Sequence, residues 1–502
     1  MLRPVLTAAL VTSSLTFGGA LAAISVPPSA EGQSPIELRA PDEVVVRSDR
    51  GWVHSDFGVR VVARGEHFLV HAIRPQDYDG PIEAVWKTES GDVALGEMDS
   101  WQGLDRFSYV EVFRRGERVR HRFSDACFNG RSRKVGPGSP AGPSDPFPLG
   151  CPWNPYTLGS VMGVAQDHAV PLLSSWNNRM RLEPGRYRMV AGITRPWREK
   201  LQISAADATV TTTLVVEKRT AATSDPSAPA HRSGTDDLEA TAAAPTDGSA
   251  GAMSSEYAPD LRSLPAFDIG LNGTGTALSF GATVWNGGAG PLVIEGFRDG
   301  EDHMTAYQYY FDEFGNQTGY DRVGHLDYHA GNHQHWHFRD FARYSLFRPD
   351  ESDPELPGEI AVRSTKASFC LVATDAVDLT VPHADMRPEH TDLGSQCGGS
   401  GAQMLRQVLA NGHGDTYHQF RAGQAFRVGT LPDGDYFLSV EANPADDETA
   451  ENGGRNLQEL DYANNDSYRR FRLWTTPGGV RKVRAYQVGV IEELSFGDFG
   501  MR

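Results

Sequence analysis

Apolar and polar residues alternate in short runs along most of the chain, which is the period of half-buried β-strands. The clearest run is 277–284, where the apolar residues are Leu278, Phe280, Ala282 and Val284. Similar runs occur at 67–70, 109–113, 209–216 and 436–440, and clusters of Gly and Pro separate them. We find no long stretch with the 3.6-residue period of a helix. The pattern therefore predicts an all-β protein of the sandwich type.

The composition divides the chain into two β-rich parts. A first β domain is predicted over 36–217, and a second over 257–485. Between them, 218–256 is dominated by Ala, Ser, Thr, Pro, Asp and Gly, with almost no large apolar residue. Such a segment cannot bury enough surface to offset its ordering entropy. We expect two β-sandwich-like domains joined by a flexible linker.

The first 23 residues have the form of a secretion signal. Arg3 gives a positive start, an apolar stretch follows, and Ala20-Leu21-Ala22 has the small-x-small pattern of a cleavage site. A membrane anchor is the alternative, but the apolar run is shorter than the roughly 20 residues that a span requires. We find no later segment apolar enough to span a bilayer, and we expect a secreted protein.

The four cysteines, Cys127, Cys151, Cys370 and Cys397, are an even number, as expected for disulfides outside the cell. Their positions favour the local pairs 127–151 and 370–397, although spacing alone leaves three connectivities open. Metal-binding thiols are the alternative, but no Cys-x-x-Cys pair occurs.

The net charge of −18 indicates which classes of binding partner the protein would attract or repel. An acidic surface repels phosphate backbones, which argues against nucleic acid, and it attracts cations such as protonated amines.

The strongest chemical signal is a cluster of histidines. Four of the 16 histidines lie within nine residues, at His329, His333, His335 and His337. The last three alternate, so in a strand their imidazoles project to one face. Neutral imidazole suits Cu, Zn, Fe or Ni, and the spacing does not choose among them. We predict a metal site, with His329 as a fourth ligand or a neighbouring group.

The segment His333-Gln334-His335-Trp336-His337, followed by Asp340-Phe341-Ala342-Arg343-Tyr344, resembles the copper-binding loop of lysyl oxidases. Lys366-Ala367-Ser368-Phe369-Cys370-Leu371 is similar to the segment that carries the family's cofactor lysine. Asp415-Thr416-Tyr417 is similar to the segment that carries its cofactor tyrosine. The resemblance implies copper at His333, His335 and His337, and a lysine tyrosylquinone formed from Lys366 and Tyr417.

A further resemblance to the family concerns calcium. Pro259-Asp260-Leu261 and the segment 459–465 are similar to segments that hold a calcium ion in lysyl oxidases. Oxygen ligands of this kind suit that ion. The residues implied are Asp260, the carbonyl of Leu261, Glu459, Asp461, Asn464 and Asn465. The alternative is a polar loop in which the Asn-Asn pair forms a turn.

The resemblance covers about 257–473 and leaves the first domain without a role. It implies oxidation of primary amines, either lysine side chains in proteins or small amines, to aldehydes by O2. Animal relatives have more cysteines here, and a histidine where this chain has Arg343, so that histidine's role does not transfer. The general base is not assigned; Asp415, Asp340 and His329 lie near the motifs. Copper ligation by imidazole also predicts that activity falls below about pH 6.

Three other functions remain open. An inactive relative would bind copper without forming the quinone. A structural or adhesive protein would bind no stoichiometric metal. A zinc hydrolase is the third, but no His-Glu-x-x-His helix accompanies the histidines.

Overall fold

The computed structural model describes residues 34–53, 56–136, 145–173, 179–218, 243–329, 334–366, 368–388, 393–445 and 454–491. Within these ranges the chain forms 33 strands and one helix, α1 (Arg195–Lys200). The prediction of an all-β protein is therefore confirmed. The predicted signal segment and residues 219–242 of the predicted linker lie outside the described residues.

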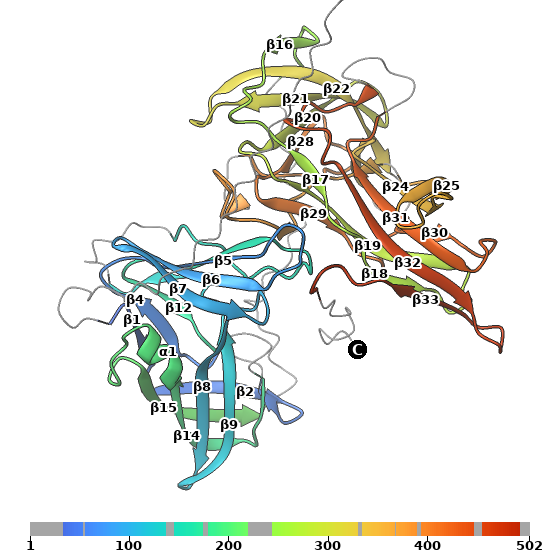
Figure 1. The fold of residues 1–502 in the computed structure, drawn as a ribbon. Coiled ribbons are helices and arrows are strands. Elements are labelled where there is room, and N and C mark those ends of the chain that lie inside the picture. The colour runs from blue at the N-terminus through green and yellow to red at the C-terminus, as the bar shows by residue number, and fades with distance from the viewer. Residues whose placement is uncertain are drawn as a thin grey trace, which may run out of the picture.

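The N-terminal part is built from three sheets, which form the blue-to-green body of Figure 1. One has the order β1 (Ile36–Arg39), β4 (Arg60–Ala63), β12 (His168–Pro171) and β10 (Arg133–Lys134). A second has the order β11 (Gly159–Val164), β5 (Phe68–Ile73), β6 (Ile82–Thr88) and β7 (Gly91–Met98). The third has the order β13 (Met180–Arg181), β3 (Trp52–Val53), β2 (Glu43–Asp49), β15 (Thr209–Lys218), β14 (Gly185–Ile193), β8 (Leu104–Arg114) and β9 (Glu117–Ala126).

The C-terminal part also contains three sheets (Figure 1). The one we call the histidine sheet has the order β26 (Ser368–Phe369), β23 (His335–Arg339), β22 (Gln317–His329), β21 (His303–Phe311), β20 (Leu292–Arg298) and β28 (Met404–Leu409), with β16 (Ser249–Gly251) on β22. A second joins β17 (Leu261–Ser263), β19 (Ala277–Asn286), β29 (His413–Tyr417) and β27 (Asp375–Ala376), with β18 (Phe267–Leu271) and β30 (Ala425–Arg427) on β19. The third has the order β25 (Pro357–Arg363), β24 (Ala342–Pro349), β31 (Gly434–Ala442), β32 (Asp466–Thr475) and β33 (Arg481–Ala485).

One short strand lies where the sequence predicted no element. Strand β16 falls inside the predicted linker, and its three residues pair with β22. Gly251 has a φ of 72°, and a Cβ built on it would lie 2.0 Å from the carbonyl oxygen of Thr318. Only glycine allows this close approach between two backbones. Strand β16 is therefore held by its backbone pairing with β22 and not by burial of apolar side chains.

Both local disulfides are present, which confirms the predicted pairing. Cys127 bonds to Cys151 and Cys370 to Cys397. Each closes a loop of about 25 residues, a constraint worth roughly 3 kcal/mol in the chain-entropy model. The second disulfide lies directly beside the candidate site.

Each part has its own main core, one within 36–216 and one within 261–473, and two smaller clusters join them. In the larger joining cluster, Tyr156 and Leu158 pack against Trp285 and Val377. Backbone bonds continue the contact, because the amides of Leu158 and Gly159 both donate to the carbonyl of Val377. The two parts are therefore docked through buried apolar surface. None of the helices in the described ranges has the length and apolarity needed to cross a bilayer.

Candidate active site and metal centre

Lys366 and Tyr417 lie against each other, although 50 residues separate them in the chain. Lys366 precedes β26, and Tyr417 is the last residue of β29. The Nζ atom of Lys366 is 4.0 Å from the centroid of the Tyr417 ring. The ring of Phe369 packs edge-on against Tyr417 at 4.9 Å. The structure thus brings together the two residues that the resemblance assigns to the cofactor.

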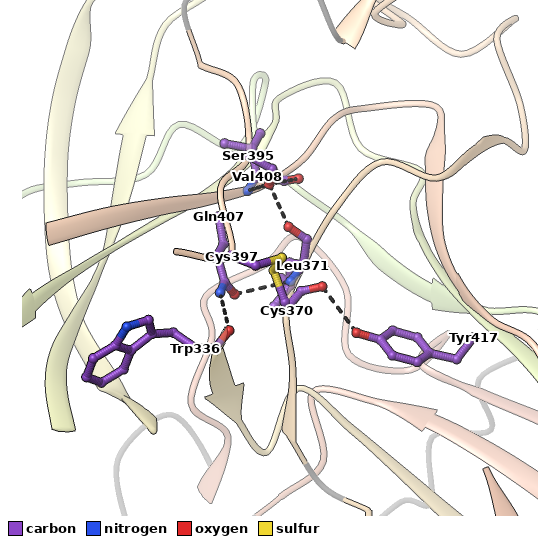
Figure 2. The surroundings of a disulfide bond; sticks show 8 residues. All are labelled: Trp336, Cys370, Leu371, Ser395, Cys397, Gln407, Val408 and Tyr417. Carbon is purple, nitrogen blue, oxygen red and sulfur yellow. Dashed lines mark hydrogen bonds between the residues drawn. A yellow bond between two sulfur atoms is a disulfide. The ribbon is translucent and has the colours of Figure 1, made fainter. Parts of the chain in front are cut away.

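The disulfide beside Tyr417 helps to fix its position. The hydroxyl of Tyr417 donates to the carbonyl of Cys370 at 3.2 Å, as Figure 2 shows. Gln407 holds the same segment from the other side: its Oε1 accepts from the amide of Leu371, and its Nε2 donates to the carbonyl of Trp336. Since Trp336 lies between two of the predicted copper ligands, Gln407 connects the two halves of the candidate centre.

Lys366 has the electrostatic character of a nucleophile. The pKa of its amine is lowered to about 8, chiefly by burial; the negative charge of Asp415 opposes this shift, and the positive charge of Arg421 adds to it. Nζ also approaches the carbonyl of Ala422 at 3.4 Å. A lysine with this pKa has a substantial neutral fraction near pH 8, whereas an ordinary lysine has almost none.

The pKa of Lys366 predicts how the rate of cofactor formation depends on pH. Only the neutral amine can add to the tyrosine ring, so the rate should rise roughly tenfold per unit below about pH 8 and level off above it. The measurement is the rate at which the Lys366–Tyr417 linkage appears after copper is added to metal-free protein in air. A rate that is flat between pH 6.5 and 9 would show that the amine is not the titrating group.

Two buried carboxyl groups lie next to this pair. Burial raises the pKa of Asp415 well above its usual range, and the nearby charge of Asp375 adds to the effect. Burial also raises the pKa of Asp375 to about 6. Asp375 accepts from Thr374 at 2.7 Å, whereas Oδ2 of Asp415 is buried with no hydrogen-bond partner in the described part of the chain. An unpartnered carboxyl oxygen beside a reactive amine is suited to accepting a proton.

The N-terminal part reaches into this network, which the sequence did not predict. The Nδ2 of Asn154 donates to Oδ2 of Asp375 at 3.0 Å and to the hydroxyl of Thr283 at 2.8 Å. Thr283 in turn shares a hydrogen bond with Thr416, the neighbour of Tyr417. Asn154 is fully buried. An asparagine in a loop of another domain has no signature of its own, so only the docked structure could identify it.

Trp153, the neighbour of Asn154, makes a second contact with the site. Its ring lies 4.9 Å from the ring of His418, which follows Tyr417. Burial and the charge of Arg421 lower the pKa of His418 to about 4, so this imidazole is neutral at physiological pH. Phe420 stacks on it from another side at 5.3 Å.

Removing the Asn154 amide should destabilise the protein most where Asp375 is ionised. The Asn154→Ala variant removes the donor to Oδ2 of the buried Asp375 carboxylate, which keeps its bond from Thr374, at a cost of about 1–3 kcal/mol. Asp375 has its pKa raised to about 6 in the fold. Below that pH the carboxyl is protonated and the lost donor costs less. Unfolding free energies at pH 7.5 and 5 should therefore differ, with the larger loss at pH 7.5; equal losses would contradict the coupling.

The histidines form a row on one face of the histidine sheet. His335 and His337 lie on β23, with His329 opposite His335 on β22. The ring centroids of His335 and His337 are 4.7 Å apart, and those of His329 and His337 are 4.5 Å apart. His333 lies outside the described residues. Neutral imidazole nitrogens suit copper. Among the described residues, however, the ring nitrogens of the row do not all lie within 4.8 Å of one another, so the side chains would have to turn to share one ion.

Ser368 links the two halves of the candidate centre. Its hydroxyl lies 3.2 Å from Nε2 of His329 and 3.5 Å from Nδ1 of His337. The next residue, Phe369, points into the core and contacts Tyr417. Because successive side chains of a strand point to opposite faces, Ser368 faces the histidine row, whereas Phe369 faces the Tyr417 ring.

Most of the predicted calcium ligands also come together. The carboxylate of Glu459 accepts from the amide of Leu261 at 2.7 Å and from Nδ2 of Asn465 at 2.8 Å. Nδ2 of Asn464 lies 3.1 Å from Oδ1 of Asp260. Asp461 is exposed, and its carboxylate accepts from the amide of Ala463 instead.

The oxygen atoms of these residues suit a hard cation. Oδ1 of Asn464 and Oδ1 of Asn465 are buried without a hydrogen-bond partner among the described residues. Asp260 and Glu459 are buried acids, and burial raises the pKa of Glu459 to about 7. A bound cation would partner the oxygens and stabilise the carboxylates. One feature opposes it, because Nε of Arg262 already pairs with Asp260 at 2.7 Å.

Comparison with known proteins adds no assignment. No protein-family model matches the chain. No curated protein matches it either. Extracellular domains 3–5 of Drosophila OTK align over 83% of this chain and 94% of that chain, with 8% identity and a TM-score of 0.10. Dimeric latent PorU from Porphyromonas gingivalis aligns over 82% of this chain and 32% of that chain, again with 8% identity and a TM-score of 0.10. Scores this low carry no argument about fold or function.

Proposed function

We propose that this protein is a secreted copper-dependent oxidase of primary amines, similar in its chemistry to lysyl oxidases. The observation that carries the proposal is the position of the Lys366 amine, 4.0 Å from the Tyr417 ring, with its pKa lowered to about 8. A half-buried lysine over a tyrosine ring is costly for the fold, because the charged amine loses part of its solvation. Formation of a covalent linkage between the two side chains would explain why the lysine is held at this position.

Each residue of the pair has a defined part in forming the cofactor. Copper held by His333, His335 and His337, together with O2, would supply the oxidation of the Tyr417 ring. In that oxidation one O2 would add an oxygen to the ring and leave as water, giving a quinone. The neutral Nζ of Lys366 would then add to a ring carbon, and a second O2 would take two electrons and two protons from the adduct and become hydrogen peroxide. The bond from Tyr417 to the Cys370 carbonyl would hold the ring with its face toward Lys366 during this step.

Asp415 is the group best suited to act as the general base. Of the three acids and bases near the motifs, it alone has an unpartnered buried oxygen and acts electrostatically on Lys366. His329 belongs to the histidine row, and Asp340 lies in the turn after β23. In its ionised form Asp415 would take the proton from the carbon next to the substrate nitrogen. Its raised pKa makes it a stronger base than an exposed aspartate.

The overall reaction balances without any further reagent. A primary amine, O2 and water give an aldehyde, ammonia and hydrogen peroxide, with the amine oxidised by two electrons and O2 reduced by two. The net charge of −18 favours a cationic amine as the substrate, either a protein lysine or a small amine. Two disulfides fit an oxidising compartment. A calcium ion at the Asp260–Glu459 cluster would serve a structural role.

One observation favours a second candidate, a copper-binding protein that does not form the quinone. The histidine row contacts β26 through Ser368, whereas the Tyr417 ring contacts it through Phe369 on the other face. Oxidation of Tyr417 therefore requires the segment around Ser368 to rearrange, or O2 to reach both sides of the strand.

The two candidates differ in a direct assay. Copper-loaded full-length protein is incubated with a primary amine, and peroxide release is followed before and after treatment with phenylhydrazine. The oxidase releases peroxide and loses this activity once its quinone carbonyl is blocked. Bound copper without peroxide release would support the inactive copper protein.

A further inference from the structure

A second group of metal-binding side chains lies on the face of the histidine sheet that carries the histidine row. His303 on β21 and His325 and Asp327 on β22 each offer one ligand atom, and these three atoms lie within 4.8 Å of one another. We call this group the His303 cluster. All three side chains are partly exposed, so an ion could reach them from solvent.

The strand register holds the cluster in place. His303 is directly opposite Asp327, and Thr305 is opposite His325. Residues between them, Met304 and Leu326, point into the core. The three ligands therefore project from a fixed sheet surface, so little backbone entropy is lost when they bind an ion.

A carboxylate behind His303 orients its imidazole. Nδ1 of His303 lies 2.5 Å from Oδ1 of Asp299, and the other oxygen of Asp299 accepts from the hydroxyl of Thr305 at 2.5 Å. Nδ1 is therefore the protonated nitrogen of the neutral ring, and Nε2 carries the free lone pair. A carboxylate that fixes the tautomer in this way is the usual support of a metal-binding histidine.

The spacing of the other two ligands also suits an ion. Nε2 of His325 is 3.8 Å from Oδ1 of Asp327. Two ligand atoms of a tetrahedral zinc site, each about 2.0–2.1 Å from the metal, lie roughly 3.3 Å apart. A small rotation of either side chain would close this difference.

Arg339 provides the competing explanation. Its Nη1 lies 3.3 Å from Nε2 of His325, and its Nε lies 3.6 Å from Oδ2 of Asp327. In this alternative, Arg339 pairs with His325 and Asp327 in an ordinary surface network, and no metal ion is bound. However, the Arg339 side chain is 53% exposed and can turn into solvent, whereas the histidines and Asp327 stay on the sheet.

We propose that the His303 cluster binds a divalent transition-metal ion of the Zn²⁺ or Cu²⁺ kind, through His303, His325 and Asp327. Two imidazoles and one carboxylate form a three-ligand site with a fourth position for water. Asp327 is also the cross-strand partner of His337. The cluster therefore adjoins the histidine row on the same face, as a second and separate site. This proposal does not depend on amine oxidation.

The test uses full-length protein from which the row has been disabled by His335→Ala and His337→Ala. After treatment with a chelator, the protein is titrated with Zn²⁺ and with Cu²⁺, and bound metal is measured per chain. We expect one ion per chain, and an at least tenfold weaker affinity when His303→Ala or His325→Ala is added. Asp299→Asn should weaken binding by a smaller factor. Arg339→Ala should tighten it several-fold, because the competing cation is gone.

His121→Ala is the matched control, since His121 is an exposed strand histidine far from the cluster in the chain. It should leave the affinity unchanged, and thermal unfolding of each variant checks that the fold is retained. No stoichiometric binding in the row-disabled protein would overturn the proposal. So would binding that is insensitive to His303 and His325. Because the row is absent throughout, neither result bears on the proposed oxidase.

Discussion

Replacing Lys366 by Ala is expected to abolish amine oxidation and to leave Tyr417 as an unmodified tyrosine. The lysine supplies one half of the cofactor. Its loss therefore removes the group that accepts the substrate's electrons, and not merely a single interaction with the substrate. We expect activity to fall at least about a thousandfold, or about 4 kcal/mol of transition-state stabilisation. Tyr417→Phe should have the same effect, because the ring can no longer be oxidised at the phenol. The measurements are peroxide release and reactivity with phenylhydrazine.

Two variants serve as controls for this result. Lys482 and Tyr468 are exposed residues on β33 and β32, and Lys482→Ala and Tyr468→Phe should keep full activity. Lys366→Ala should also retain its copper, because none of the predicted ligands is changed. Substantial activity in either the Lys366 or the Tyr417 variant would mean that the oxidation, if present, uses another cofactor.

Removing two histidines of the row is expected to abolish copper binding at the centre and, with it, cofactor formation. In the His335→Ala, His337→Ala double variant, the remaining imidazoles cannot enclose an ion with three nitrogens. We expect the copper that resists dialysis against a weak chelator to fall by about one ion per chain relative to the unaltered protein. The Lys366–Tyr417 linkage should not form, although both residues are intact.

His337 is 3% exposed, so its replacement also leaves a small buried space. The single variant His335→Ala, at a half-buried position, separates the loss of a ligand from a loss of stability. His121→Ala again controls for the loss of an exposed histidine. A linkage that forms in the double variant at the normal rate would show that the row does not supply the oxidation of Tyr417.

The sequence predicted the fold class because strand patterns depend on short-range order. The run 277–284 lies within β19 and 436–440 lies within β31, although β19 is buried on both faces from Phe280 on and 436–440 is buried throughout. Strand β16 could not be predicted, because its residues are small and exposed and its stability comes from pairing with β22. Arrangement into sheets depends on contacts between distant segments, which a single sequence does not display.

Some residues of the candidate site could be predicted from the sequence, and others could not. Lys366, Tyr417 and the histidines could be named in advance because each lies in a recognisable local motif. Asp375, Asn154 and Trp153 could not, since their roles arise only when two domains dock. The sequence did not indicate that Ser368 would face the histidine row while Phe369 faces the Tyr417 ring. That depends on the one-residue alternation of Ser368 and Phe369.

The most direct test of the central claim is peptide mass spectrometry of the copper-loaded, air-exposed protein after proteolysis. Our account predicts a single cross-linked species in which the peptide containing Lys366 is joined to the peptide containing Tyr417, and it predicts that phenylhydrazine adds to this species. Two separate peptides with unmodified Lys366 and Tyr417, recovered from protein with bound copper, would contradict it.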